Sequence, residues 1–165
     1  MKLLIAHGGK SGGCRSMAAL LAELLPRHQV TLTDLIGEMP DPADFDHVVL
    51  GGAVRMGRLD RRVREYMKRY RGALVTVPHT LFLCCAFAEH FENYAEMLFP
   101  NDILESAEEC VYFGGELNPA KQKGLDRLLA RMMRNAVLES EDNDAMLPGL
   151  LPEHVRQLAD RLKGK

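Results

Sequence analysis

A glycine-rich segment near the amino terminus has the residue types that hold a phosphate. Residues 7–14 read HGGKSGGC. Glycines let a backbone turn tightly and approach a ligand closely, and the N–H groups at the start of a helix favour an anion. Ser11 adds a hydroxyl donor and Lys10 adds a counter-charge. The spacing matches neither GxGxxG nor GxxxxGK[ST], so the segment predicts a phosphate loop of another type, and the alternative is a glycine turn without a ligand.

A second candidate segment, residues 51–58, reads GGAVRMGR and follows the apolar run Val48–Leu50. Gly57 has no Cβ, so it adopts a positive φ at little cost. Cations gather in this loop and in the helix expected after it: Arg55, Arg58, Arg61, Arg62, Arg64, Lys68, Arg69 and Arg71. One cation ~8 Å from an anion, at an effective dielectric of ~40, stabilises it by about 1 kcal/mol. The alternative for the distal residues, Arg64 to Arg71, is a solvated basic helix face.

A third candidate segment is the end of the apolar run Thr80–Cys85 together with Ala86 and Phe87. The Phe87 ring suits either the cover of a planar ligand or the core face of a helix. Cys84 and Cys85 are neighbours that point to opposite faces of a strand, which argues against a shared zinc ion or a disulfide. They are expected to be buried packing residues, because no nearby group in the sequence lowers a thiol pKa. No CxxC pair and no paired-acid constellation is present in the sequence. The sequence therefore predicts no metal site and no catalytic side chain of its own.

The totals describe one globular unit. The chain has 165 residues, 47% of them hydrophobic and 27% charged, which suffices for one domain over 1–165 with its own core. A net charge of −2 gives no electrostatic reason to expect nucleic acid as a partner. No apolar run is long enough to predict a transmembrane segment. The first residues also lack the pattern of a signal peptide, so none is expected. We therefore expect a cytoplasmic protein with reduced thiols.

Short apolar runs alternate with segments of helical periodicity, and these elements must position the three candidate segments. The expected strands are Leu3–Ala6, Val30–Leu35, Val48–Leu50, Thr80–Cys85 and Cys110–Phe113, the third being stopped by Gly51-Gly52 and the fifth by Gly114-Gly115. The expected helices begin near Met17, Val63, Phe87, Pro119 and Pro152, and they run to about Leu25, Tyr70, Phe99, Asn135 and Leu162. Residues 139–144 are acidic and are expected to form a mobile link.

This alternation predicts an α/β sandwich of three layers around a parallel sheet. In open parallel sheets, ligands bind outside the carboxyl ends of the strands, at the point where the winding reverses. The three candidate segments leave the carboxyl ends of the first, third and fourth expected strands. They are therefore expected to lie at one edge of the sheet.

The first loop resembles that of flavodoxins, which read S/T-x-T-G-x-T after the first strand. Residues 9–14 keep the frame, Gly12 and a hydroxyl at Ser11, and they depart from it at Gly9 and Cys14. The resemblance implies a flavodoxin-like fold with five parallel strands in the order 2-1-3-4-5. It also implies FMN as the cofactor, with its phosphate held by Gly9, Lys10, Ser11, Gly12, Gly13 and Cys14.

The second loop is similar to that of the flavodoxin-domain family that contains the bacterial quinone-coupled protoporphyrinogen oxidase. Its G-A/G-x-[IV]-R-x-G element is matched by residues 51–57, and the likeness continues over residues 110–133, where Asp126-Arg127 lies in a helix. Some flavodoxins carry Met-Gly here, and in those the glycine peptide accepts a hydrogen bond from N5–H of the reduced flavin. The resemblance implies that the flavin ring is bounded by Ala53, Val54, Arg55, Met56, Gly57, Cys84, Cys85, Ala86 and Phe87.

Three functions remain open at this point. The first is an FMN-binding electron-transfer protein, either a shuttle or the flavin subunit of a reductase, whose basic rim steers an acidic redox partner. The second is an oxidase similar to protoporphyrinogen oxidase. That family carries a basic extension where residues 89–109 are here acidic. The third is an interaction module without flavin.

Overall fold

The computed structural model describes residues 1–10, 12–115 and 149–165. Five parallel strands form the sheet, in the order β2-β1-β3-β5-β6. Their bounds are β1 Lys2–Gly8, β2 Gln29–Asp34, β3 His47–Arg55, β5 His79–Cys84 and β6 Glu109–Tyr112. A two-residue strand, β4 (Arg58–Leu59), pairs antiparallel with the end of β3. Because β4 lies off the main path, the sheet has the predicted order, and the α/β class is confirmed.

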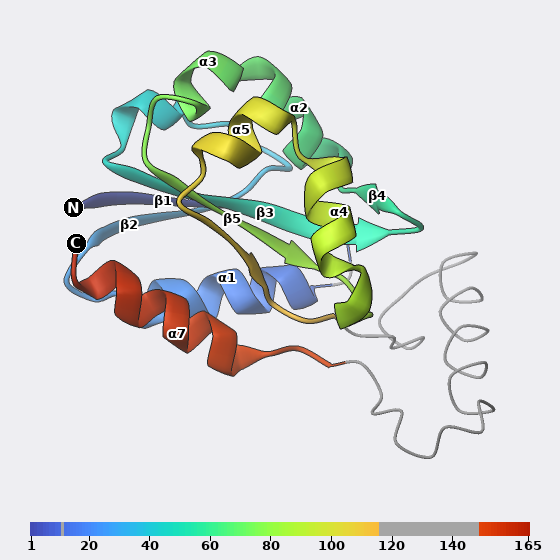
Figure 1. Cartoon of the computed structure of the whole chain (residues 1–165). Helices are drawn as coiled ribbons and strands as arrows, with labels where there is room; N and C mark the ends of the chain where they lie inside the picture. Colours follow the sequence, from blue (N-terminus) through green and yellow to red (C-terminus); the bar gives the residue numbers. More distant parts are fainter. Residues whose placement is uncertain (11, 116–148) are drawn as a thin grey trace.

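Helices cover both faces of the sheet (Figure 1). On one face lie α1 (Gly13–Glu23) and α7 (Pro152–Lys163). The other face carries α2 (Arg61–Arg69), α3 (Arg71–Leu74), α4 (Phe91–Leu98) and α5 (Asn101–Ser106). Two single turns of 3-10 helix, η1 (Pro42–Asp44) and η2 (Ala88–His90), complete the described elements.

Each face of the sheet has its own core because successive side chains of a strand point in opposite directions. Ile5 and Phe82 pack with α1 and α7, whereas Leu4 and Leu81 pack with the helices of the opposite face. All four side chains are fully buried. The solid apolar runs of the sequence are therefore the central strands of a sheet that is covered on both sides.

Gly51-Gly52 does not end its strand as the sequence predicted, whereas β6 does end, at Tyr112, just before Gly114-Gly115. β3 continues through Gly51 and Gly52 to Arg55, and β1 includes His7 and Gly8. A Cβ on Gly51 would lie 2.0 Å from the Phe82 carbonyl oxygen and 2.6 Å from its ring. Glycine serves here to let the large Phe82 side chain of β5 lie against the backbone of β3.

The segment after β5 also differs from the expectation of one helix from Phe87 to Phe99. Phe87 is extended, with φ −117° and ψ 121°, and α4 begins only at Phe91, after η2. The last helix begins at Pro152, as predicted. Proline is favourable at this position because a backbone N–H in the first turn of a helix has no intrahelical acceptor, so its loss costs nothing. The helix expected over 119–135 and the acidic link at 139–144 lie outside the described residues.

The two ends of the chain lie side by side at one end of the sheet (Figure 1). There the Lys165 ammonium forms an ion pair with Glu108, the residue before β6. The carboxyl ends of the strands, which carry the candidate loops, lie at the opposite end.

Candidate functional site

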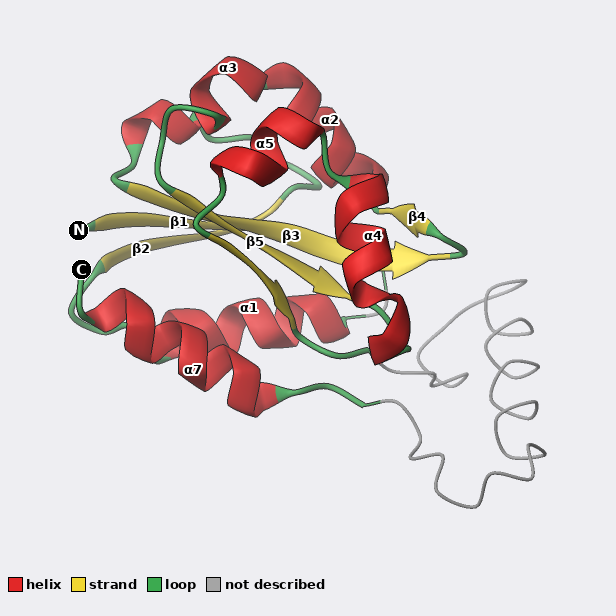
Figure 2. Ribbon diagram, viewed as in Figure 1, coloured by secondary structure: helices red, strands yellow, loops and turns green. Residues whose placement is uncertain are grey.

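The three candidate segments meet at the carboxyl ends of β1, β3 and β5, which are neighbours in the sheet (Figure 2). The register places Gly8 of β1 beside Gly52 of β3, and Ala53 of β3 beside Cys84 of β5. The loops therefore leave the sheet at the same level, as the sequence predicted from strand order.

The first loop leads directly into the N-terminus of α1. Gly12 precedes the helix with a φ of 85°, and nothing lies within 4 Å of the position that a Cβ would take there. The helix begins at Gly13 without a side-chain cap and without an acidic residue in its first turn. The first N–H groups of a helix have no intrahelical acceptor, and the helix dipole adds partial positive charge there. This end of α1 therefore suits an anion, with Lys10 exposed beside it, whereas Ser11 lies outside the described residues.

The Cys14 side chain is buried beneath the loop, where a Cβ on Gly9 would lie 3.1 Å from its Cβ. Its residue is 2% exposed and packs in the core on the α1 side of the sheet, together with Cys84. The neighbouring Cys14 thiol and burial raise the pKa of Cys84 well above its ordinary value. Cys14 therefore contributes a backbone N–H to the start of α1, and its side chain fills the core.

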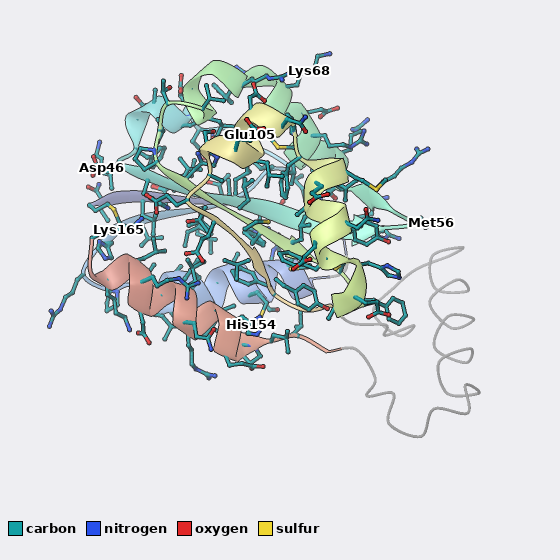
Figure 3. The ribbon with its side chains drawn as sticks, viewed as in Figure 1. Asp46, Met56, Lys68, Glu105, His154 and Lys165 are labelled. Carbon is teal, nitrogen blue, oxygen red and sulfur yellow. The ribbon has the colours of Figure 1, made fainter. Side chains whose placement is uncertain are left out.

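The second loop is a tight hairpin between β3 and β4. Arg55 pairs with Arg58, so Met56 and Gly57 are the two turn residues, with φ values of 50° and 70°. Positive φ at both positions is the requirement of a two-residue type I′ turn. Met56 is the only non-glycine residue with a positive φ among those the structure describes. Its side chain is 77% exposed and projects from this end of the molecule (Figure 3).

The left-handed conformation of Met56 costs roughly 1–2 kcal/mol relative to the right-handed one. Strain of this kind persists only where the surrounding structure imposes it, and it is concentrated at binding sites and switches. The hairpin was not expected from the sequence, because Met-Gly is not one of the Asn-Gly or Asp-Gly pairs that indicate such turns.

The cations near the second loop have different environments. Arg58 is exposed in the hairpin. Arg62, in contrast, donates from Nε to Asp60 Oδ1 at 2.9 Å and lies 3.3 Å from Asp34 Oδ1. These two carboxylates raise the pKa of Arg62 and neutralise its charge. Arg62 therefore belongs to the packing of α2 and adds no uncompensated charge to the site.

The third loop begins at Cys85, whose thiol is buried. The thiol donates to the Phe87 carbonyl oxygen at 3.6 Å, and burial raises the pKa of Cys85 to about 11. Cys85 is therefore a protonated packing residue at neutral pH, as expected. Ala86 and Phe87 are half-buried, and the Phe87 ring meets the His90 ring edge to face, with 6.1 Å between centroids.

Two residues that hold the third loop, Tyr112 and Gly115, were not expected from the sequence. The Tyr112 hydroxyl donates to the Cys85 carbonyl oxygen at 2.8 Å. A Cβ on Gly115 would lie 2.5 Å from that same carbonyl group, so Gly115 packs directly on the Cys85–Ala86 peptide. Tyr112 is an unremarkable strand residue in the sequence, and only the neighbouring position of β5 and β6 brings it to this carbonyl.

Among the described residues, no group of three His, Cys, Asp or Glu side chains is arranged to hold a metal ion. Within the same parts of the chain, no helix has the length and apolar character needed to cross a bilayer.

Residues 4–144 match the model of a family described as a flavodoxin domain. This chain belongs to the flavodoxin-domain family. Membership supports a flavin as the cofactor, and the first loop, with its open turn and uncapped helix, is compatible with a flavin phosphate. No curated protein sequence matches the chain.

Solved structures resemble this flavodoxin-domain protein in fold. An oxidoreductase from Corynebacterium diphtheriae has a TM-score of 0.59 at 12% identity, over 99% of this chain and 94% of that one. A flavodoxin from Streptococcus pneumoniae TIGR4 has a TM-score of 0.55 at 12% identity, over 99% of both chains. Rubredoxin oxygen:oxidoreductase from Desulfovibrio gigas has a TM-score of 0.54 at 11% identity, over 97% of this chain and 36% of that protein. At these identities the likeness shows the shared fold.

Proposed function

We propose that this flavodoxin-domain protein binds FMN at the carboxyl ends of β1, β3 and β5 and transfers electrons to a partner protein. The observation that carries the proposal is the meeting of three loops on adjacent strands, one entering an uncapped helix and one forming a strained turn. When bound, FMN supplies the redox chemistry, and the protein supplies position and electrostatics.

The first loop is the proposed phosphate site. The N–H groups of Gly13 and Cys14, at the first turn of α1, are proposed to donate to the phosphate oxygens, with Lys10 as counter-charge. Gly9, Ser11 and Gly12 complete the loop. Because the Cys14 thiol is buried in the core, the phosphate would be held mainly by backbone groups. This arrangement still provides charge-assisted hydrogen bonds, which are stronger than neutral ones.

The second and third loops are the proposed walls for the flavin ring. Ala53, Val54 and Arg55 end β3 and lead to the Met56-Gly57 turn, whose peptide is proposed to exchange hydrogen bonds with the ring edge. On the other side, Tyr112 donates to the Cys85 carbonyl and the Cys85 thiol donates to the Phe87 carbonyl, so the backbone of the third loop is held in one orientation. Cys84, the last residue of β5, is buried in the core on the α1 side of the sheet.

A carrier of electrons fits the chain better than an oxidase similar to protoporphyrinogen oxidase. The segment that is basic in that family includes α4 and α5 here and carries seven acidic residues. Asp102, Glu108 and Glu109 form ion pairs, and the other four carboxylates would repel a carboxylated substrate. We place the protein in the cytoplasm, where its four free cysteines stay reduced.

Titration of the purified flavin-free protein with FMN tests the proposal. Flavin fluorescence should be quenched to an endpoint of one FMN per chain, and riboflavin should bind far more weakly because it lacks the phosphate. Equal affinity for FMN and riboflavin would contradict the phosphate site, and no saturable binding of either would contradict the flavin site as a whole.

A further inference from the structure

A groove of about 430 Å³ lies between α2 and the segment that joins α4 to α5. Its floor is apolar: Met67 and Phe99 are each 2% exposed, and Leu98 lies beside them. Met97 stands at its edge with 68% of its surface exposed. A methionine side chain is flexible and polarisable, so it adapts to the shape of an apolar partner group.

One side of the groove is formed by cations. Arg64, Lys68 and Arg71 line it, and no Asp or Glu is among its lining residues in the described part of the chain. Arg71 Nε donates to Asp102 at 2.7 Å, which offsets its charge. Arg64 donates to the Leu59 carbonyl oxygen, and among the described residues neither Arg64 nor Lys68 forms an ion pair with an acidic side chain. Two charges therefore remain uncompensated beside an apolar floor.

We propose that this groove is a docking site for an acidic segment of a partner protein. Carboxylates of that segment pair with Arg64 and Lys68, and an apolar side chain enters over Met67 and Phe99 beside Met97. We assign this surface to the redox partner. That the partner exchanges electrons rests on the proposed function, whereas the binding of an acidic segment does not. The groove does not include any of the three flavin loops, and Lys68 and Met56 lie on different sides of the molecule (Figure 3).

The shape and the charge pattern favour a protein segment over a membrane surface. The groove is concave between two helical segments, so a flat layer of lipid headgroups would reach the cations but would leave the apolar floor unfilled. Arg64 and Lys68 are four residues apart on one helix, a rise of ~6 Å, which matches the spacing of alternate side chains of an extended peptide. Pairing of alternate acidic residues with this row leaves intervening side chains free to enter the groove.

The probe for the test is a fluorescein-labelled peptide in which glutamates alternate with leucines, and binding is followed by fluorescence anisotropy at low ionic strength. We expect saturable binding that weakens as salt is added. The double variant Arg64→Glu with Lys68→Glu should lower affinity roughly tenfold or more. Met97→Ser should lower it about threefold, because it removes apolar contact from the exposed edge of the groove.

The matched control is the double variant Arg27→Glu with Arg156→Glu, which has the same net charge and alters exposed sites on the opposite side of the sheet. It should bind as the unchanged protein does. An equal loss in the control would show non-specific attraction and overturn the proposal, as would the absence of saturable binding. Stronger, Lys68-dependent binding to phosphatidylglycerol vesicles than to the peptide would assign the surface to membranes and would also overturn it.

The flavin-free and FMN-treated proteins are measured in parallel. Peptide binding should be the same in both, and the Arg64/Lys68 variant should titrate with FMN normally. Failure of FMN binding with retained peptide binding would remove the proposed function and leave the docking site. Normal FMN binding without peptide binding would remove the docking site and leave the proposed function.

Discussion

Met56 occupies a left-handed backbone conformation that costs energy, with its side chain largely in solvent. Asparagine tolerates this conformation far better than methionine. Met56→Asn should therefore raise the free energy of unfolding by about 0.5–1 kcal/mol, as measured by urea denaturation. The control is Met97→Asn, at a methionine of the right-handed α4 that is 68% exposed against 77% for Met56, and it should leave stability unchanged or slightly lower. A gain at Met97 equal to that at Met56 would show that the backbone strain is not its source.

Arg58 is the exposed cation nearest to the Met56-Gly57 turn in the chain, and its effect is electrostatic. If flavin binds at the turn, a positive charge ~8 Å away stabilises the anionic reduced flavin by about 1 kcal/mol, which corresponds to roughly 40 mV for one electron. Arg58→Gln should make the second reduction potential more negative by about that amount in spectroelectrochemical titration. Arg27→Gln, on the other side of the sheet, should change it by less than about 10 mV. Similar shifts in both variants would refute a local effect.

At the scale of an element, α2 depends on Asp60. The Asp60 carboxylate caps the helix by accepting from the Arg62 N–H at 3.0 Å, and it also binds the Arg62 side chain. The Arg62 hydrogen bonds lower the pKa of Asp60 although burial acts in the opposite direction. We expect Asp60→Ala to lower the free energy of unfolding by about 2–3 kcal/mol, because it removes a cap and one partner of a mostly buried ion pair.

Asp41 is the matched control, since it caps the exposed turn η1 by accepting from the Ala43 N–H but pairs with no cation in the part of the chain that the structure describes. Asp41→Ala should lower the free energy of unfolding by about 1 kcal/mol or less. Equal losses for the two variants in urea denaturation would mean that the Arg62 ion pair adds nothing to α2.

At the scale of the whole molecule, His47 couples stability to pH. It is 1% exposed, and its Nε2 lies 3.1 Å from the Thr80 hydroxyl. Burial first, and then Lys165 and His79, lower its pKa to about 4 from 6.5. Between these two values the unfolded chain binds a proton that the folded protein excludes, so stability falls as pH falls from 6.5 toward 4. The slope for one proton is at most about 1.4 kcal/mol per pH unit.

Urea denaturation at several pH values measures this slope. His7 acts in the same direction because burial also lowers its pKa. His47→Gln, which cannot take up the proton, should therefore reduce the slope between pH 6.5 and 4 without abolishing it. A slope unchanged by His47→Gln would show that other groups account for the pH dependence.

The sequence predicted the α/β class and the meeting of the three loops because apolar runs and helical periodicity reflect burial directly, whereas the strand order followed from the resemblance to flavodoxins. It did not predict where the strands end, because Gly51 meets the Phe82 side chain of another strand, and contacts of that kind have no local pattern. The same limit applies to Tyr112, whose partner carbonyl belongs to a distant segment. The β3–β4 hairpin was missed for a different reason, since Met56 adopts a conformation that its residue type disfavours.

The neighbouring chain ends, opposite the candidate loops, determine how the protein is best attached to a support. A tether of a few residues after Lys165 would hold the molecule on an electrode with its loop-bearing end turned outward to solution. Electron exchange would then have to cross the length of the sheet or proceed through a diffusing mediator. A tether at an engineered cysteine close to the β3–β4 hairpin would instead place the loop-bearing end against the electrode.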